Sequence, residues 1–425
     1  MLTESGRQEH AGDGVSLAQE GPNMTSRERV LAALNHQEVD RVPIDVGGTE
    51  VTGFHGIAYN RLKAHLGLED GRTRLFHLYM QLACVEDPIR ARFSGDVVRL
   101  SFEAKRWKPW TLSDGSACEV PETWSPVRGE DGSEALMGMD GKPLVQRHAD
   151  SPWFSPTGPI CPLIQAPEDV AKYKEVLQIM DRSAWLDETL EDLVARAKAI
   201  RDETDCAIAG VFGGHIFAAS QLIRGMANFM CDLVADEKLA TTLMETITDL
   251  HMEEFEEYMA ALGPYLDVVS VADDLGSQQG PQIDPDMWRR LVKPSMARLY
   301  AFMKSKMDHA KLFLHSCGSV YDFIPDLIEM GVDVLNPIQV GAANMDTKRL
   351  KAEFGNDIVF WGGGCDTQSV LNLATPAQVR DEVKRRIDDL APGGGFIFAQ
   401  VHNIQPDVPP ENMVAMWEAA REFGG

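Results

Sequence analysis

The sequence predicts an α/β fold, a (β/α)8 TIM-like barrel with a β-hairpin insertion near residues 105–154. Three observations predict it: eight short apolar runs, amphipathic stretches between them, and one region where turn sequences interrupt this alternation. Short, continuously apolar runs are typical of parallel strands that are buried on both faces. The amphipathic stretches between them then supply the helical crossovers that parallel strands require.

We expect the ordered chain to begin at about residue 24. Residues 1–23 are polar and lack hydrophobic periodicity, which predicts a disordered tail ahead of a single barrel domain over 24–425. Thr25 followed by Glu28 forms a capping box, which predicts that a helix starts there. The tail contains no apolar run typical of a signal peptide, and Met24 is a candidate for the true start.

The eight predicted strands are apolar runs of five to seven residues. In chain order they are 42–46, 96–100, 206–212, 266–272, 311–315, 332–336, 357–361 and 395–399. Residues 236–262 and 376–390 carry the clearest helical patterns between or beside these runs.

The insertion is predicted from the turn sequences DGS, GEDGS and DGKP, and it holds four of the eight tryptophans. Two placements are compatible with this composition. The insertion caps the mouth of the barrel, or it forms an ornament at the edge whose aromatic side chains pack against the barrel wall.

Charge and composition exclude several classes of function. The chain has 40 Lys and Arg against 65 Asp and Glu, a net charge of −25, so we expect no nucleic-acid partner. No stretch approaches the roughly 18 uncharged apolar residues that span a bilayer, so we expect no membrane association. Seven cysteines, an odd number, suit a reducing compartment, and we expect a cytoplasmic protein.

Metal-ligand chemistry follows three of the predicted strands, at the barrel end where active sites form. His315 and Cys317 follow one strand, Cys365 and Asp366 follow a run of three glycines after another, and His402 follows the last. Taken alone, each of these histidines, cysteines and aspartates could equally be a structural residue that is buried or forms a turn. Together they offer more than the three protein ligands that a catalytic zinc site with one open position requires.

Asp366 is also a candidate substrate contact, and two further segments offer others. Asp273 and Asp274 follow a predicted strand, and because adjacent side chains diverge, one is expected to face the cavity while the other caps a turn. Gly213 and His215 lie between a strand and a helix, where free backbone N–H groups could hold an anion; close packing of helix on strand is the alternative.

Several motifs resemble the uroporphyrinogen decarboxylase superfamily from about Met24 to the end of the chain. They are RERVLAALNHQEVDRVPIDVGG, DDLGSQQGPQIDPDMW, FLHSCG and VHNIQPDVPPENM. The resemblance implies a (β/α)8 barrel and two branches of activity. True uroporphyrinogen decarboxylases need no cofactor, whereas the other branch consists of zinc-dependent corrinoid methyltransferases.

The methyltransferase branch is the closer resemblance. True decarboxylases carry an arginine-rich stretch similar to WMMRQAGR soon after the DRVP element, whereas no arginine occurs here between Arg41 and Arg61. A substrate with eight carboxylates needs such cationic donors. The methyltransferase pattern of His-x-Cys and a distant third ligand is similar to His315, Cys317 and His402, and Cys365 stays open as the alternative third ligand.

The resemblance implies a zinc-dependent methyltransferase that moves a methyl group between a corrinoid protein, or a related methyl donor, and a small thiol or pterin acceptor. Zinc is then the expected cofactor, cobalamin is bound transiently or carried by a partner, and Asp273 or Asp274 orients the acceptor or a metal ligand. Two alternatives remain: a carboxy-lyase acting on a tetrapyrrole or a smaller acid, with His402 and an aspartate moving protons, and a non-catalytic corrinoid- or metal-binding module. The oligomeric state stays open, a homodimer being one option.

Overall fold

The computed structural model describes residues 23–425 except 69–70, 139–140, 175–176 and 178–185. The disordered tail predicted for residues 1–23 therefore lies outside the described residues, apart from residue 23. Seven parallel strands form one sheet in the order β15-β14-β13-β12-β11-β10-β3. They are β3 Val97–Leu100, β10 Ala207–Gly213, β11 Val268–Ala272, β12 Lys311–His315, β13 Val334–Asn336, β14 Val359–Trp361 and β15 Phe396–Ile397. All seven coincide with predicted runs, and the curled sheet with its flanking helices confirms the barrel-like α/β fold.

The eighth predicted strand, 42–46, is a bridged segment rather than a regular strand. Ile44 forms a parallel bridge with Phe398, and the Asp96 N–H donates to the Ile44 carbonyl at 2.7 Å. The Asp96 carboxylate accepts the Ile44 N–H at 2.8 Å, which replaces a ladder bond, and Pro43 has no N–H to donate. The segment therefore lies between β15 and β3 and joins the two edges of the sheet.

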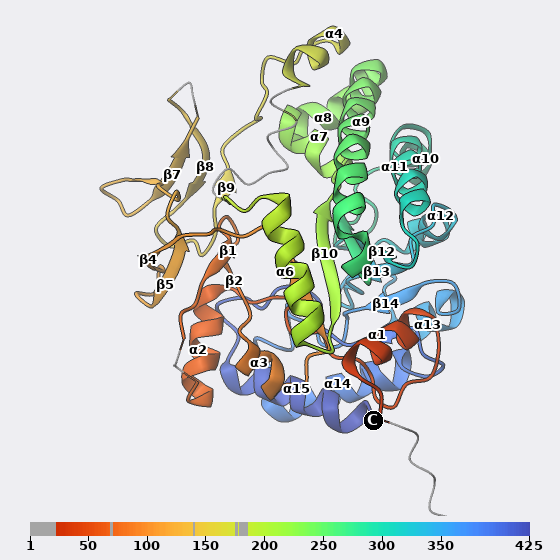
Figure 1. The fold of residues 1–425 in the computed structure, drawn as a ribbon. Helices are drawn as coiled ribbons and strands as arrows, with labels where there is room; N and C mark the ends of the chain where they lie inside the picture. Colours follow the sequence, from red (N-terminus) through yellow and green to blue (C-terminus); the bar gives the residue numbers. More distant parts are fainter. Residues whose placement is uncertain (1–22, 69–70, 139–140, 175–176, 178–185) are drawn as a thin grey trace, which may run out of the picture.

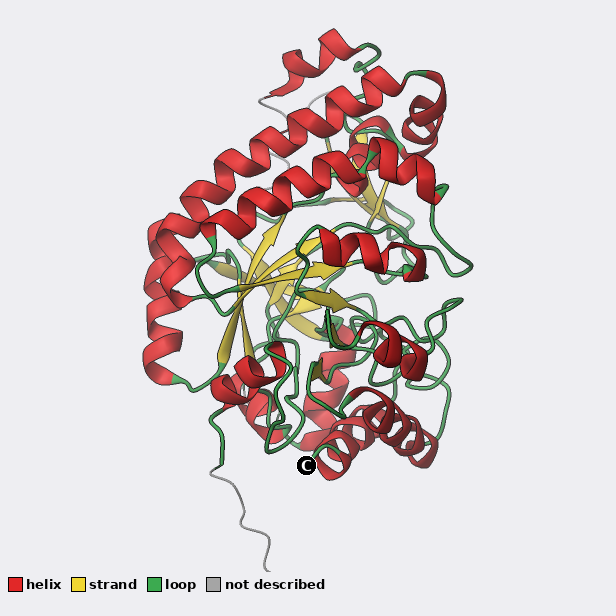
Figure 2. Ribbon diagram, turned by 90° about the vertical axis from the view of Figure 1, so that its right-hand side faces the viewer, coloured by secondary structure: helices red, strands yellow, loops and turns green. Residues whose placement is uncertain are grey.

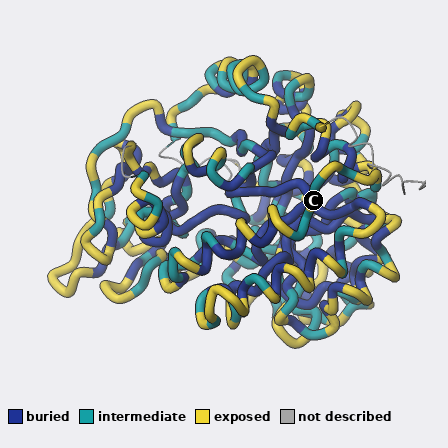
Figure 3. Tube along the Cα trace, turned by 90° about the horizontal axis from the view of Figure 1, so that it is seen from below, coloured by how far each residue is buried: buried dark blue, intermediate teal, exposed yellow. Residues whose placement is uncertain are grey.

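The interior of the barrel is filled by alternate residues of the strands. Val97, Ala207, Ala209, Val268, Phe313, Val334, Val359, Trp361, Ile397 and Ala399 form one buried cluster. Helix α1, Ser26–Leu34, adds Val30, Ala33 and Leu34 to the same cluster, and the Thr25–Glu28 capping box predicted from the sequence starts it. Figures 2 and 3 show the strands in the middle of the molecule and the exposed segments on the outer helices and the insertion.

The remaining helices surround this core, and the two predicted most clearly are confirmed as α9 and α14. They are α2 Gly56–Leu66, α3 Asp87–Arg92, α4 Pro167–Val170, α6 Leu190–Glu203, α7 Phe217–Arg224, α8 Met226–Ala235, α9 Glu237–Leu262, α10 Pro285–Leu291, α11 Lys293–Lys306, α12 Ile324–Glu329, α13 Thr347–Phe354, α14 Pro376–Leu390 and α15 Pro410–Phe423. None of the helices in the described ranges is long and apolar enough to cross a membrane.

The insertion consists of two small antiparallel sheets rather than one hairpin. β4 Trp107–Thr111 pairs with β5 Ala117–Pro121, and a four-stranded sheet follows: β6 Val127–Arg128, β7 Glu134–Met137, β8 Pro143–Arg147 and β9 Ser155–Pro156. The insertion lies beside β1 Leu75–His77 and β2 Leu82–Ala83 (Figure 1). Trp124 is buried and packs edge-on against Phe154, so some aromatic side chains of the insertion face inward.

Candidate functional site

The candidate site lies where neighbouring parallel strands end at the same level. The register aligns Ala272 of β11 with His315 of β12, and His315 with Asn336 of β13. Side chains at this level that face the barrel interior are therefore close together, although up to 64 residues separate them in the chain. This is the carboxyl end of the strands, where barrel enzymes carry their chemistry.

His315, Cys317 and His402 come together at this end of the barrel. One ligand atom from each lies within 4.8 Å of the other two, and Cys317 Sγ is 3.3 Å from His315 Nε2. The imidazole rings of His315 and His402 are 5.2 Å apart between centroids. Ligands about 2.0–2.3 Å from a tetrahedral zinc are separated by about 3.3–3.8 Å, so this two-nitrogen, one-sulfur set suits zinc after a small closure.

Cys365 is not part of this group. Its side chain is fully buried, the contact of its Sγ is the Asp366 carbonyl at 3.9 Å, and burial raises the pKa of its thiol well above the ordinary value. The Cys365 carbonyl accepts the Val401 N–H at 3.0 Å. Cys365 therefore holds the backbone beside His402, and of the two ligand sets that the sequence left open the geometry favours the one with His402.

Asp366, predicted to contact substrate, is engaged within its own turn. Its carboxylate accepts the Gln368 N–H at 2.9 Å and the Ser369 hydroxyl at 2.5 Å, and its side chain is largely buried. Both oxygens thus cap the loop after β14. The structure thus gives Asp366 a structural role in its turn, and a substrate contact at Asp366 stays a prediction.

The orientation of His315 is set by Asn336. His315 Nδ1 lies 2.7 Å from Asn336 Oδ1, and Asn336 Nδ2 donates to the Trp361 carbonyl at 2.9 Å. Because the amide nitrogen is engaged with a carbonyl, the amide oxygen must accept the proton of Nδ1, which leaves the Nε2 lone pair on the side of Cys317. Sequence reasoning missed Asn336, although it is the polar last residue of a predicted strand.

The loop after β12 fixes Cys317 against the loop after β11. The Cys317 N–H donates to Asp274 Oδ1 at 2.8 Å, and the Gly318 N–H donates to Gln339 Oε1 at 2.6 Å. Gly318 has φ +88°, and a Cβ there would lie 2.5 Å from the backbone of Gly276. Only glycine allows the two loops this approach, which explains the glycine after Cys317.

The two adjacent aspartates have different roles. The buried Asp273 carboxylate accepts the backbone N–H groups of Ile216, Phe217 and Ala218 at 2.6–3.0 Å, so it caps the start of α7. The carboxylate of Asp274 is half-exposed and its Oδ1 lies 3.9 Å from His315 Nε2. Asp273 thus caps a helix, the catalytic role of either aspartate stays a prediction, and the place of Asp274 beside His315 favours Asp274 for it.

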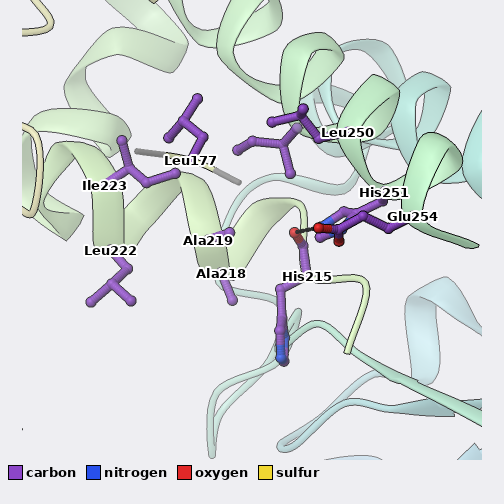
Figure 4. Close-up of a pocket in the computed structure, with 10 residues that line it drawn as sticks. Leu177, His215, Ala218, Ala219, Leu222, Ile223, Leu250, His251 and Glu254 are labelled. Carbon is purple, nitrogen blue, oxygen red and sulfur yellow. Dashed lines mark hydrogen bonds between the residues drawn. The ribbon is translucent and has the colours of Figure 1, made fainter. Parts of the chain in front are cut away.

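The anion site predicted at Gly213 and His215 is occupied by the protein itself, because the N–H groups at the start of α7 are engaged by Asp273. Gly213 and Gly214 have positive φ, and a Cβ at Gly214 would lie 3.1 Å from Val271. His215 borders an apolar pocket of about 250 Å³ between α7 and α9, but its imidazole points away from the apolar side chains (Figure 4). Its carbonyl accepts from His251 Nε2 at 2.9 Å.

Burial shapes the electrostatics of the three candidate ligands. Burial lowers the pKa of His315, and it lowers the pKa of His402 to about 3. The two imidazoles also lie side by side, and the charge that His315 would carry when protonated disfavours protonation of His402. Burial and the Asp274 charge raise the pKa of the Cys317 thiol. Both imidazoles are therefore neutral and ready to donate a lone pair, and a bound cation is needed to stabilise the thiolate.

Comparisons with known proteins agree with this architecture. A family model described as uroporphyrinogen decarboxylase (URO-D) matches residues 155–423. A uroporphyrinogen decarboxylase of Psychromonas ingrahamii is 25% identical over 182 residues, 43% of this chain and 49% of that protein. One of Alkalilimnicola ehrlichii is 40% identical over 50 residues, 12% of this chain and 14% of that protein. The chain thus matches at most about half the length of these relatives.

A solved structure supports the fold over nearly the whole chain. A methyltransferase from Methanosarcina mazei superposes with a TM-score of 0.57 at 20% identity, covering 94% of this chain and 99% of that one. At this identity the likeness concerns the fold.

Proposed function

Because the chain belongs to the uroporphyrinogen decarboxylase family, we propose that it is a zinc-dependent methyltransferase of that family. It would move a methyl group between a corrinoid protein, or a related methyl donor, and a small thiol or pterin acceptor. The observation that carries the proposal is the convergence of His315, Cys317 and His402 within 4.8 Å at the carboxyl end of the barrel. The methyltransferase fold of the M. mazei structure is compatible with it.

In this proposal His315, Cys317 and His402 hold the zinc ion. When bound, zinc supplies a Lewis acid that lowers the pKa of an acceptor thiol, so that a thiolate nucleophile exists near neutral pH. Asn336 keeps His315 in the tautomer whose Nε2 can donate a lone pair, and Asp274 orients the acceptor. Cys317 and His402 are partly exposed, which leaves the centre open to a substrate from solvent.

A decarboxylase activity is the second candidate, because both curated relatives are uroporphyrinogen decarboxylases. The arginine within the DRVP element and the next arginine after it do not support it. Arg41 pairs with the buried Asp96, and Arg61 on α2 donates to the Pro406 carbonyl. The Arg41 guanidinium is thus already paired with a carboxylate, whereas the side chain of Arg61 is 49% exposed and lies 3.9 Å from Asp114. A single exposed arginine does not supply the cationic cluster that the eight carboxylates of a tetrapyrrole need.

Methyl transfer from methylcobalamin to a small thiol distinguishes the candidates. The proposal predicts thioether formation that stops when a chelator removes zinc and returns when zinc is added. A decarboxylase would instead release carbon dioxide from uroporphyrinogen with or without the chelator. A module that only binds would retain cobalamin without turnover.

A further inference from the structure

Arg99 on β3 is a buried cation to which the proposed function gives no role. Val97 belongs to the cluster that fills the barrel interior, whereas Leu100 packs with the surrounding helices. Because side chains alternate along a strand, Arg99 faces the interior, as does Ala209, its register partner on β10. Arg99 lies two residues beyond Val97 toward the carboxyl end of the strand. It therefore lies above the apolar core, on the side of the barrel mouth.

The Arg99 guanidinium is held from one edge and one face. Its Nη2 donates to the Glu103 carboxylate at 3.0 Å and lies 3.8 Å from Cys84 Sγ. Its central carbon lies 3.7 Å from the centre of the Phe76 ring. Glu103 is itself held in place by Arg196 on α6, whose Nη1 lies 3.4 Å from the same carboxylate. The position and plane of the Arg99 guanidinium are therefore fixed by the protein before any ligand binds.

Arg99 Nη1 is buried and has no hydrogen-bond partner, and the whole side chain is only 7% exposed. A buried donor without an acceptor is costly, and a guanidinium cannot lose its charge to reduce that cost. The fold avoids this cost at comparable buried arginines, since all three side-chain nitrogens have acceptors in Arg29, Arg224 and Arg386. In the part of the chain that the structure describes, Arg99 alone among the arginines has a buried nitrogen that lacks an acceptor. This exception points to an acceptor that a ligand supplies.

We propose that Arg99 binds the carboxylate of a small molecule at the barrel mouth, through Nη1. An anionic acceptor suits a permanently charged guanidinium, because hydrogen bonds between charged groups are shorter and stronger than neutral ones. Glu103 on Nη2 fixes the guanidinium, while Nη1 offers two N–H groups to the ligand. His77, which follows Phe76 on β1, is 26% exposed, so solvent reaches this part of the mouth. The proposal concerns anion binding and does not depend on a metal at His315.

Binding of propionate to the full-length protein tests the proposal, with propionamide as the uncharged molecule of equal shape. Saturation-transfer NMR detects both molecules, and titrations at constant ionic strength give the two dissociation constants. We expect the wild type to bind propionate about tenfold more tightly than propionamide. Arg99→Gln should remove this preference. Arg147→Gln is the matched control and should keep it, because Arg147 is also buried but is bonded to Glu134 and to backbone carbonyls of the insertion.

Glu103→Gln is a second variant, and its expected effect has the opposite sign. The amide oxygen still accepts from Arg99 Nη2, but the negative charge that opposes a bound anion is removed, so propionate should bind about threefold more tightly. Urea unfolding identifies the variants that remain folded. The proposal is overturned if the wild type binds the two molecules equally or binds neither. It is also overturned by an unchanged preference in folded Arg99→Gln, or by weaker propionate binding in folded Glu103→Gln.

Discussion

The imidazole of His315 is held by Asn336, whose side-chain oxygen lies 2.7 Å from Nδ1. Asn336 is in turn held by the Trp361 carbonyl, so the ends of three neighbouring strands cooperate in directing Nε2 toward Cys317. This chain of contacts makes Asn336 a positioning residue of the proposed zinc centre. It also links the metal affinity to a residue that contacts no metal.

Asn336→Ala should lower zinc affinity about 10- to 100-fold, because His315 loses the partner that fixes its tautomer and ring orientation. Competition with a chromogenic chelator measures the affinity. Asn228→Ala is the matched control, since the Asn228 amide on α8 donates to the Arg224 carbonyl of α7 at 2.9 Å, away from the proposed centre. If folded Asn336→Ala bound zinc with wild-type affinity, Asn336 would not be a positioning residue for His315.

Asp273→Asn and Asp274→Asn should separate stability from activity. Asp273 caps α7 through three backbone N–H groups, so its substitution should cost about 1–3 kcal/mol in the free energy of unfolding. Asp274 is half-exposed beside His315, so its substitution should mainly lower turnover. Urea unfolding and methyl-transfer rates measure the two effects. Equal loss of stability in both variants contradicts the division of roles.

The strands could be predicted from the sequence because continuous burial on both faces leaves a local signature, the short apolar run. Seven of the eight runs are strands, and only 42–46 departs from the pattern, because Pro43 and the Asp96 carboxylate interrupt its ladder. His315, Cys317 and His402 were identified by ligand chemistry at strand ends and by family resemblance. Their convergence depends on strand register, which no local pattern contains.

The contacts of Asp273 and Asp366 could not be predicted from the sequence, for one physical reason. Asp273 and Asp366 look like functional carboxylates in the sequence, but their partners are backbone N–H groups or a hydroxyl whose positions only the folded chain defines. Conversely, Asn336 carries no recognisable motif, and its contact with His315 joins residues that are 21 positions apart in the sequence. Ligand type is readable from sequence, whereas orientation requires the tertiary structure.

Gly318→Ala should destabilise the site beyond the ordinary strain of a positive φ. A Cβ at Gly318 would meet the Gly276 backbone at 2.5 Å, and Cys317 would be displaced. Gly67→Ala is the control, since Gly67 has φ +65° and no atom near its added Cβ. Both variants should lose about 1 kcal/mol from backbone strain, and only Gly318→Ala should lose zinc. Similar melting temperatures and zinc contents in the two variants would show that the loop after β12 tolerates a Cβ at residue 318.

Asp45 should make stability depend on pH. Burial raises the pKa of its carboxyl to about 6, against hydrogen bonds from Thr52, Gly48 and Trp361 that favour the ionised form. A group whose pKa is raised on folding contributes stability below its unfolded pKa, near 4, and loses that contribution as pH rises through 6. The stability of the wild type relative to Asp45→Asn should therefore fall by about 2 kcal/mol between pH 4 and pH 7.

Urea unfolding of the wild type and Asp45→Asn at several pH values measures this difference directly. The comparison cancels the titration of other carboxylates that the two proteins share. A difference that stays constant or increases with pH would show that Asp45 titrates at or below its ordinary pKa.

The proposed zinc centre is tested by the zinc content of four purified proteins: the wild type, Cys317→Ser, His402→Ala and Cys365→Ser. We expect about one zinc per chain in the wild type and in Cys365→Ser, because the Cys365 thiol is buried away from the centre. Cys317→Ser and His402→Ala should lose most of the metal while remaining folded. A folded wild type without zinc, or loss of zinc from Cys365→Ser but not from Cys317→Ser, contradicts the proposed zinc centre.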